Sequence, residues 1–95
     1  MGDIQVRNNP GENRYEAWLD GELAGVAVYE PRQDAVVFTH TEVDDRFEGK
    51  GVGSTLVRGA LDDVRTQGDQ HVVPLCPFVK GWIDNHPDYQ DLLRG

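Results

Sequence analysis

The chain has 95 residues, of which 38% are hydrophobic, and it carries a formal net charge of −8 at pH 7. This length predicts one small domain, residues 1–95, and two Trp, three Phe and three Tyr are too many for a disordered chain. The acidity excludes a nucleic-acid-binding protein, because phosphate backbones require a basic surface.

The rare residues and the N-terminus limit the chemistry and the compartment. The single cysteine excludes an intrachain disulfide framework, and the three histidines have no metal-ligand spacing, so no metal is expected. The segment Met1–Arg7 has no apolar signal region, and no run approaches the length that spans a membrane. A cytoplasmic protein without membrane contact is expected, as a monomer or weak homodimer.

In chain order, the first half predicts an antiparallel meander. Asp20-Gly21 is a strong hairpin signal between two segments of alternating apolar residues, and Pro31–Asp34 is a further turn. Asn8–Gly11 is a turn by its composition. The strands expected from this pattern are Ile4–Val6, Arg14–Asp20, Leu23–Tyr29 and Ala35–Thr41.

The hydrophobic period then changes to that of a helix. Apolar residues recur at helical spacing over Val52–Val64, and Gly68 is placed to end the helix. His71–Cys76 is the next expected strand. It should lie parallel to Ala35–Thr41, because strand, helix and strand in this order form a crossover.

Prolines limit regular structure in the C-terminal part. Pro77 suits the first turn of a short helix over Phe78–Asn85, and Pro87 limits that helix. Pro74 lies inside the expected strand, where it has no N–H and cannot complete a ladder on the side that it faces.

The segment Glu42–Ser54 places three glycines between a strand and the start of a helix. Glycines let the backbone approach a phosphate closely, while unpaired N–H groups and the helix dipole favour an anion. A Walker loop requires Ser or Thr directly after Gly-Lys, but Lys50 is followed by Gly51. A dinucleotide fingerprint requires G-x-G-x-x-G, whereas this segment contains G-x-G-x-G.

The pattern Arg46-x-x-Gly49-x-Gly51 matches the Q/R-x-x-G-x-G/A signature of the GNAT acetyltransferases. The chain is similar to the minimal, single-domain branch of this superfamily, and the resemblance extends over residues 15–93. Beyond the signature, it is carried by the segments His40–Val43, Val73–Phe78 and His86–Tyr89.

The resemblance implies an α+β (α/β) GNAT-like fold. In it, an antiparallel meander precedes a βαβ crossover whose two parallel strands splay apart at the cofactor site, and a short C-terminal helix follows. Pro74 is expected at or near the splay, with a tolerated edge proline as the alternative.

The resemblance also implies acetyl-coenzyme A (or coenzyme A) as cofactor. The splay would admit the pantetheine arm, and the backbone of the glycine-rich loop would hold the pyrophosphate. The expected cofactor-binding residues are Val43, Arg46, Phe47, Glu48, Gly49, Lys50, Gly51, Val52, Gly53 and Ser54.

Three residues are candidates for catalysis. Cys76 precedes a helix N-terminus, which can lower the pKa of a thiol, and the resemblance places it near the thioester. It would form an acetyl-cysteine intermediate, donate a proton to the departing coenzyme A sulfur, or be only a small buried residue. His40 and Glu42 share a face by period two, and either could deprotonate an attacking ammonium. The alternatives are a strand-end histidine bonded to backbone, and a surface carboxylate or partner for Arg46.

The expected function is an acetyl-coenzyme A-dependent N-acetyltransferase. Larger members of the superfamily place two helices between their first strands, and the hairpins here are too tight to contain them. An open acceptor side suits an exposed amine: a small amine or polyamine, a protein lysine or an N-terminus. The alternatives are a catalytically weak coenzyme A-binding module and a protein-interaction module on the same fold.

Overall fold

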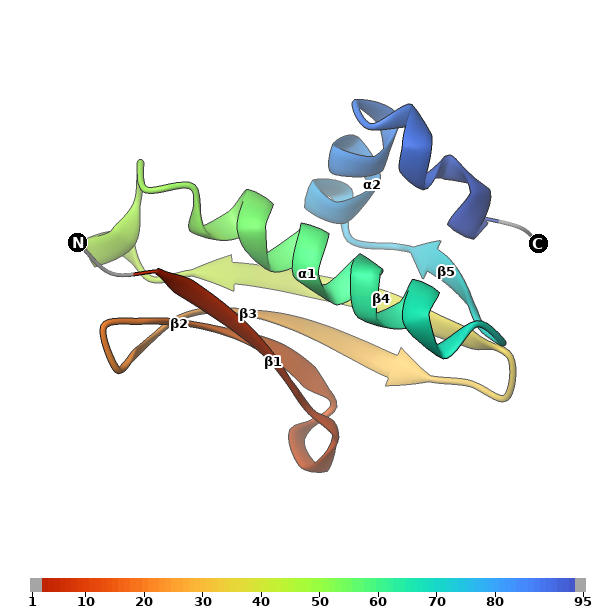
Figure 1. Ribbon diagram of the computed structural model, residues 1–95, viewed down its shortest axis with the longest axis horizontal. Coiled ribbons are helices and arrows are strands. Elements are labelled where there is room, and N and C mark those ends of the chain that lie inside the picture. Colours follow the sequence, from red (N-terminus) through yellow and green to blue (C-terminus); the bar gives the residue numbers. More distant parts are fainter. Residues whose placement is uncertain (1–2, 94–95) are drawn as a thin grey trace.

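A computed structural model describes residues 3–93. Its strands are β1 (Ile4–Asn9), β2 (Arg14–Leu19), β3 (Glu22–Pro31), β4 (Ala35–Val43) and β5 (His71–Pro74). They form one sheet in the order β1-β2-β3-β4-β5 (Figure 1). The first four strands pair antiparallel and β5 lies parallel to β4, so the predicted meander and crossover are confirmed.

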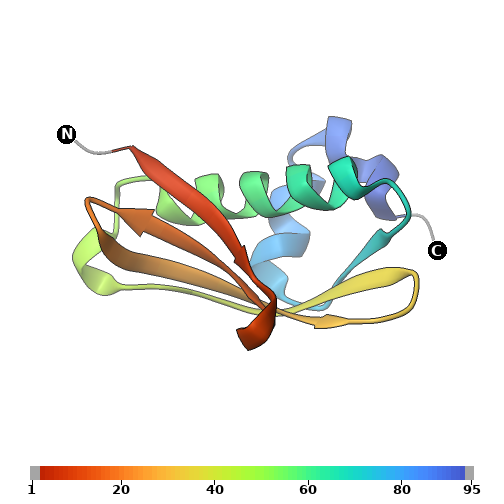
Figure 2. The same ribbon diagram turned by 60° about the horizontal axis from the view of Figure 1, so that its bottom comes forward.

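Two α-helices, α1 (Val52–Gln67) and α2 (Pro77–Asp84), lie on the same face of the sheet (Figure 2). The described part of the chain places no α-helix on the other face (Figures 1 and 2). The 3-10 segments are η1 (Pro10–Glu12), η2 (Asp45–Phe47) and η3 (Pro87–Leu93). The fold is therefore α+β, with a mixed sheet and one layer of helices.

Helix α1 forms because its apolar residues keep a helical period and glycines bound it at both ends. Its buried stripe runs from Val52 to Val64 and faces the sheet. Gly51 before the helix has φ 77° and Gly68 after it has φ 82°, values in the left-handed region that favours glycine. The Gly68 N–H donates to the Val64 carbonyl at 3.3 Å, so the predicted end at Gly68 is confirmed.

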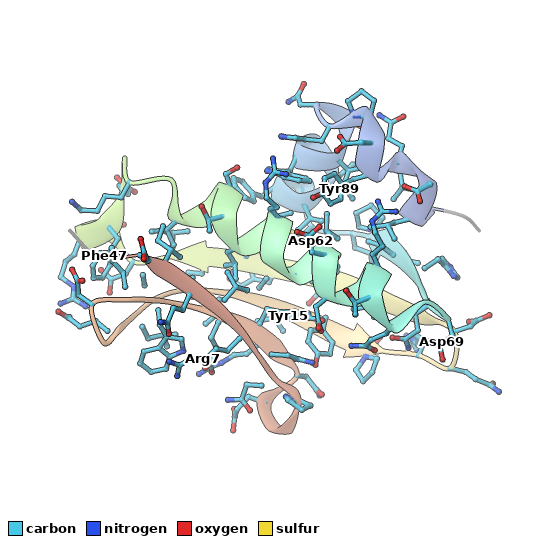
Figure 3. The ribbon with its side chains drawn as sticks, in the orientation of Figure 1. Arg7, Tyr15, Phe47, Asp62, Asp69 and Tyr89 are labelled. Carbon is cyan, nitrogen blue, oxygen red and sulfur yellow. The ribbon has the colours of Figure 1, made fainter. Side chains whose placement is uncertain are left out.

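An aromatic cluster on the helix-covered face ties the sheet to α1. The ring of Tyr15 lies 5.3 Å from that of Tyr29 and 6.1 Å from that of Phe38, measured between centroids. Tyr15 points toward α1 (Figure 3). Its hydroxyl donates to the Asp63 carboxylate of this helix at 2.6 Å. Burial, followed by this hydrogen bond, raises the pKa of Tyr15 well above its ordinary value. The C-terminal half of α1 is thus fixed over β2.

The ends of β4 and β5 differ from the prediction. β4 continues past Thr41 to Val43 because β3 pairs with it along this whole length. β5 ends at Pro74, two residues before Cys76, because the next residue, Leu75, turns its N–H back to the Val73 carbonyl instead of toward β4. The two strands are therefore unequal in length, and β4 extends beyond its parallel neighbour.

Two further segments are more regular than the sequence indicated. The turn expected over Asn8–Gly11 begins only at Pro10, because β1 pairs with β2 as far as Asn9. The segment after Pro87 forms η3, in which Tyr89 is buried against Trp82 with 4.9 Å between ring centroids. A tight 3-10 segment of this kind has no 3.6-residue period to reveal it.

The close approach of α1 to β1 predicts opposite effects for two glycine-to-alanine substitutions. A Cβ at Gly59 would lie 2.8 Å from Val6 Cβ, whereas a Cβ at Gly81 in α2 would meet nothing within 4 Å. Gly59→Ala should therefore destabilise the fold by about 1–3 kcal/mol through overpacking. Gly81→Ala should stabilise it by up to about 1 kcal/mol through helix propensity. Urea unfolding measures both, and equal stabilisation by the two substitutions would contradict this packing.

Candidate functional site

The sheet opens between β4 and β5 at one residue pair. Their parallel ladder runs from the pair Ala35–His71 to the pair Phe38–Pro74. In the described residues, β4 then continues to Val43 with no β5 residue opposite it. The pairing is not continuous over the predicted strand, so the splay expected at Pro74 is confirmed.

The backbone after Pro74 explains the opening. Pro74 has no N–H, and the N–H of exposed Leu75 turns back to the Val73 carbonyl at 3.2 Å. The Cys76 N–H makes a last bond to the Phe38 carbonyl, at 2.9 Å. Pro77 then begins α2, and the chain leaves the plane of the sheet.

The glycine-rich loop connects the free end of β4 to the N-terminus of α1. Gly49 and Gly51 have φ 82° and 77°, and a Cβ at either position would meet nothing within 4 Å. Their backbone is therefore open to a ligand from the side where side chains would stand. The first N–H groups of any α-helix lack partners within the helix, and here these belong to Val52, Gly53 and Ser54.

The other predicted cofactor-binding residues have different surroundings. Val43 and Phe47 pack against the hydrophobic core, and Val52 is buried in it, so their side chains support the loop from within. Glu48 and Lys50 are exposed at its surface. The backbone N–H groups of Phe47, Glu48 and Lys50 already donate to carbonyls within the loop. Of these residues, the side chain of Lys50 and the N–H of Val52 at the start of α1 remain for a phosphate.

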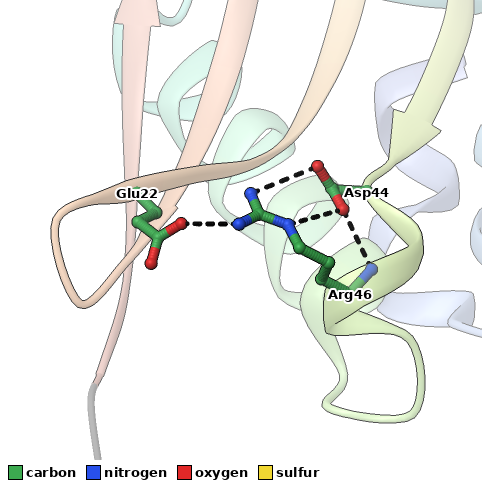
Figure 4. Close-up of polar contacts among 3 residues, drawn as sticks. All are labelled: Glu22, Asp44 and Arg46. Carbon is green, nitrogen blue, oxygen red and sulfur yellow. Dashed lines mark hydrogen bonds and ion pairs between the residues drawn. The ribbon is translucent and has the colours of Figure 1, made fainter.

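Arg46 is held by two carboxylates (Figure 4). Its Nη1 lies 2.9 Å from Glu22 Oε1, and its Nε lies 3.2 Å from Asp44 Oδ1. Asp44 Oδ1 also accepts the Arg46 backbone N–H at 2.9 Å, which caps η2. The hydrogen bonds from Arg46 lower the pKa of Asp44, and those to Asp44 raise the pKa of Arg46. Neither carboxylate is Glu42, which the sequence suggested as a partner.

A β-bulge at Thr39 decides which way the end of β4 faces. Phe38 pairs with Tyr29 and His40 with Val28, so Thr39 is an extra residue in β4. Residues on opposite sides of the bulge therefore change faces. Thr41 pairs with Ala27, which is in the core, and Thr41 accordingly lies on the helix-covered face.

His40 and Glu42 lie together on the other face of the sheet. His40 Nε2 is 3.9 Å from Glu42 Oε1, so the shared face predicted from period two is confirmed. Their side chains are 62% and 73% exposed. Both are accessible to an acceptor molecule that approaches the uncovered face of the sheet.

Cys76 lies on the helix-covered face, across β4 from His40. It is 4% exposed, and its Sγ lies 3.3 Å from Thr41 Oγ1. Burial alone would raise the pKa of the thiol. The Thr41 hydroxyl and the N–H groups of Val79 and Phe78 favour the thiolate more strongly, and the pKa lies below its ordinary value. Sequence reasoning missed Thr41, because no local signal reveals the bulge that turns it inward.

Apolar side chains from the start of α2 and from the segment before it border the opening. Leu75 and Phe78 are the large hydrophobic residues that the described chain exposes, at 66% and 46%. A Cβ at Gly53 would lie 2.8 Å from Phe78 Cζ, so glycine lets this ring rest on the start of α1. Trp82 Nε1 donates to Ser54 Oγ at 2.9 Å. The loop, α1 and α2 are thereby joined beside the opening.

An acidic hollow lies on the β3 side of the loop. Its volume is about 400 Å³, and it is formed by the start of β3 and the end of β4. Glu42, Asp44 and Asp45 contribute carboxylates to its wall. This part of the surface therefore favours cations.

Comparison with known families identifies the fold. Residues 14–92 match the model of the GCN5-related N-acetyltransferase (GNAT) family, which covers more than half of the chain. The chain belongs to this family.

Two individual proteins are also similar to this chain. Mouse protein NATD1 is 28% identical over 95 residues, which cover 98% of this chain and 86% of that protein. The solution structure of a GCN5-like protein from Staphylococcus aureus, described provisionally as an N-acetyltransferase, has a TM-score of 0.72. It is 22% identical and covers all of this chain and 92% of its own, which supports the GNAT-like fold predicted from the sequence.

Two further searches concern metals and membranes. Within residues 3–93, no three His, Cys, Asp or Glu side chains gather where they could hold a metal ion. None of the helices in the same range is long and apolar enough to cross a membrane.

The contact between Thr41 and Cys76 predicts the pH dependence of a chemical modification. Thr41→Val removes the hydroxyl but leaves Cys76 buried, so the pKa of the thiol should rise. The rate of alkylation by iodoacetamide should then increase at higher pH than in the wild type. Thr39→Val is the matched control, because the Thr39 hydroxyl contacts the Val28 carbonyl instead. Identical pH profiles for wild type and Thr41→Val would contradict the assignment.

Proposed function

We propose that this protein is an acetyl-coenzyme A-dependent N-acetyltransferase that acts on an exposed amine. The observation that carries the proposal is the position of the sheet opening. Beyond Phe38–Pro74, the free edge of β4 leads directly to the glycine-rich loop and the N-terminus of α1. A long ligand with an extended arm and a diphosphate matches an open strand edge that ends at an anion-binding helix terminus. Membership of the GNAT family supports the same ligand.

The residues present fit the coenzyme. Gly49 and Gly51 leave backbone accessible, and the N–H groups of Gly53 and Ser54 belong to the first turn of α1, where an anion is favoured. Exposed Lys50 adds a positive charge. The coenzyme supplies an activated acetyl thioester, and the protein supplies its position and the polar groups around it.

The chain provides proton-transfer groups on both faces of the opened strand. On the uncovered face, His40 with Glu42 would accept the proton of the attacking ammonium. On the helix-covered face, Cys76 would serve as the proton donor to the departing sulfur or as a nucleophile. The Thr41 contact and the lowered pKa of Cys76 are compatible with either role.

Two features favour a cationic acceptor that is not enclosed. The acidic hollow beside the loop and the net charge of −8 attract amines. The strands β1, β2 and β3 are joined by η1 and a tight turn, so no helix of the described chain covers an acceptor. A protein tail with a lysine, an N-terminus or a polyamine meets both conditions.

The alternative is a module that binds coenzyme A without significant turnover. The ion pairs of Arg46 favour it, because they occupy a cation that a coenzyme site would use. Incubation with acetyl-coenzyme A and a pool of amines and basic peptides distinguishes the two functions. Acetylated product that requires the enzyme supports the transferase, and binding without product supports the module.

A matched pair of loop glycines tests the coenzyme site. Saturation with coenzyme A at 100 times its Kd should stabilise the wild type by roughly 2.7 kcal/mol, which is several degrees in Tm for a domain of this size. Gly51→Ala and Gly68→Ala should each cost about 1–2 kcal/mol, because both glycines have positive φ. Only Gly51→Ala should also weaken the ligand-induced shift, since Gly68 lies at the far end of α1.

Comparison of the loop variant with the Gly68→Ala control shows whether the ligand binds at the loop. Equal ligand-induced shifts in Gly51→Ala and Gly68→Ala would contradict binding at the loop. A wild type that shows no shift at millimolar coenzyme A would contradict the proposed function itself.

A further inference from the structure

The segment that should bind a polyanion is itself rich in negative charge. Residues 42–52 contain the carboxylates Glu42, Asp44, Asp45 and Glu48, but only two cations. One of those cations is Arg46, whose guanidinium already contacts two carboxylates. A diphosphate approaching the loop therefore meets repulsion that Lys50 alone opposes, unless Arg46 becomes available.

The two partners of Arg46 differ in how firmly they are placed. Asp44 is two residues away in sequence, and its Oδ1 accepts both the backbone N–H and the Nε of Arg46. Glu22 comes from the start of β3, and a single contact of 2.9 Å joins it to Nη1 (Figure 4). Side chains of Glu22 and Arg46 are 55% and 63% exposed.

Because of these differences, a ligand can replace Glu22 on Arg46 more easily than it can replace Asp44. A solvent-exposed ion pair is worth at most about 1 kcal/mol, so a multiply charged phosphate can displace a single carboxylate from a guanidinium. The Asp44 contacts can remain, because they involve Nε, Nη2 and the backbone N–H and also hold η2. The outer Nη1 would then be free for the ligand.

We propose that Glu22 is a specificity-determining residue of the coenzyme site, which keeps Arg46 occupied until a diphosphate displaces it. This inference rests on the proposed function. Glu22 competes with anionic ligands for the Arg46 guanidinium. Weakly charged anions do not displace Glu22 from it, whereas a diphosphate does. The β2–β3 hairpin, which sequence reasoning left without a role in binding, thereby takes part in ligand selection.

Isothermal titration with coenzyme A tests the proposal through a charge-matched pair of variants. Glu22→Gln should lower the Kd by about three- to fivefold, since an exposed ion pair of up to about 1 kcal/mol no longer competes. Glu30→Gln removes the same charge near the other end of β3, where Glu30 is paired with Arg32. It should change the Kd by less than about 1.5-fold, because the exposed charge is screened over this distance.

Two further titrations test whether the effect of Glu22 depends on the diphosphate and on Arg46. Pantetheine, which lacks the diphosphate, should bind wild type and Glu22→Gln equally. In an Arg46→Gln background, Glu22→Gln should no longer tighten binding of coenzyme A, because the two residues act through one contact. Far-UV circular dichroism of each variant confirms that it is folded.

The outcomes distinguish a failure of the proposed function from a failure of the role of Glu22. If no variant binds coenzyme A, the proposed function is overturned, and the role of Glu22 with it. If coenzyme A binds but Glu22→Gln and Glu30→Gln have equal affinities, the role of Glu22 alone is overturned. The same holds if Glu22→Gln tightens binding equally with and without Arg46.

Discussion

The direction of one N–H group, that of Leu75, determines the geometry of the candidate site. Leu75 donates its N–H back to the Val73 carbonyl instead of to β4, so β5 ends at Pro74 while β4 continues to Val43. The chain then makes one more bond, from Cys76 to Phe38, and enters α2. A free strand edge, an inward-facing thiol and a helix N-terminus follow from this one interruption.

The opening is useful only if its surroundings are fixed, and α1 supplies that rigidity. Tyr15 bonds to Asp63 on the sheet side of α1, and Tyr89 of η3 bonds to Asp62 at 2.7 Å (Figure 3). The guanidinium of Arg58 lies 5.3 Å from the Trp82 ring centroid, which adds a contact between α1 and α2. The glycine-rich loop therefore begins and ends on elements that are held by several independent contacts.

The sequence predicted the features that depend on local signals. Asp20-Gly21 indicated a hairpin, the apolar period from Val52 indicated α1, and Gly68 indicated its end. Pro74 indicated where the opening begins, although its missing N–H lies on the free edge of β5 and not on the β4 side. The GNAT signature at Arg46–Gly51 indicated the family, which the family comparison shows.

The features that the sequence did not predict depend on strand register and on contacts between residues distant in sequence. The bulge at Thr39 exists only relative to β3, so the sequence could not place Thr41 beside Cys76 or put His40 on the other face. The contact of Arg46 with Glu22 joins residues 24 positions apart across a hairpin. Nothing in the signature itself predicts that its arginine is already paired.

The most direct test of the central claim is an amide chemical-shift titration of the 15N-labelled protein with coenzyme A. A coenzyme site at the opening predicts the largest changes in the loop and first turn of α1, at residues 49–54, and along both sides of the opening, at residues 39–43 and 75–79. The amides of Gly68–His71, at the far end of α1 and the start of β5, should change little. The largest changes at that far end, or none at millimolar coenzyme A, would contradict the claim that the opening beyond Pro74 is a coenzyme site.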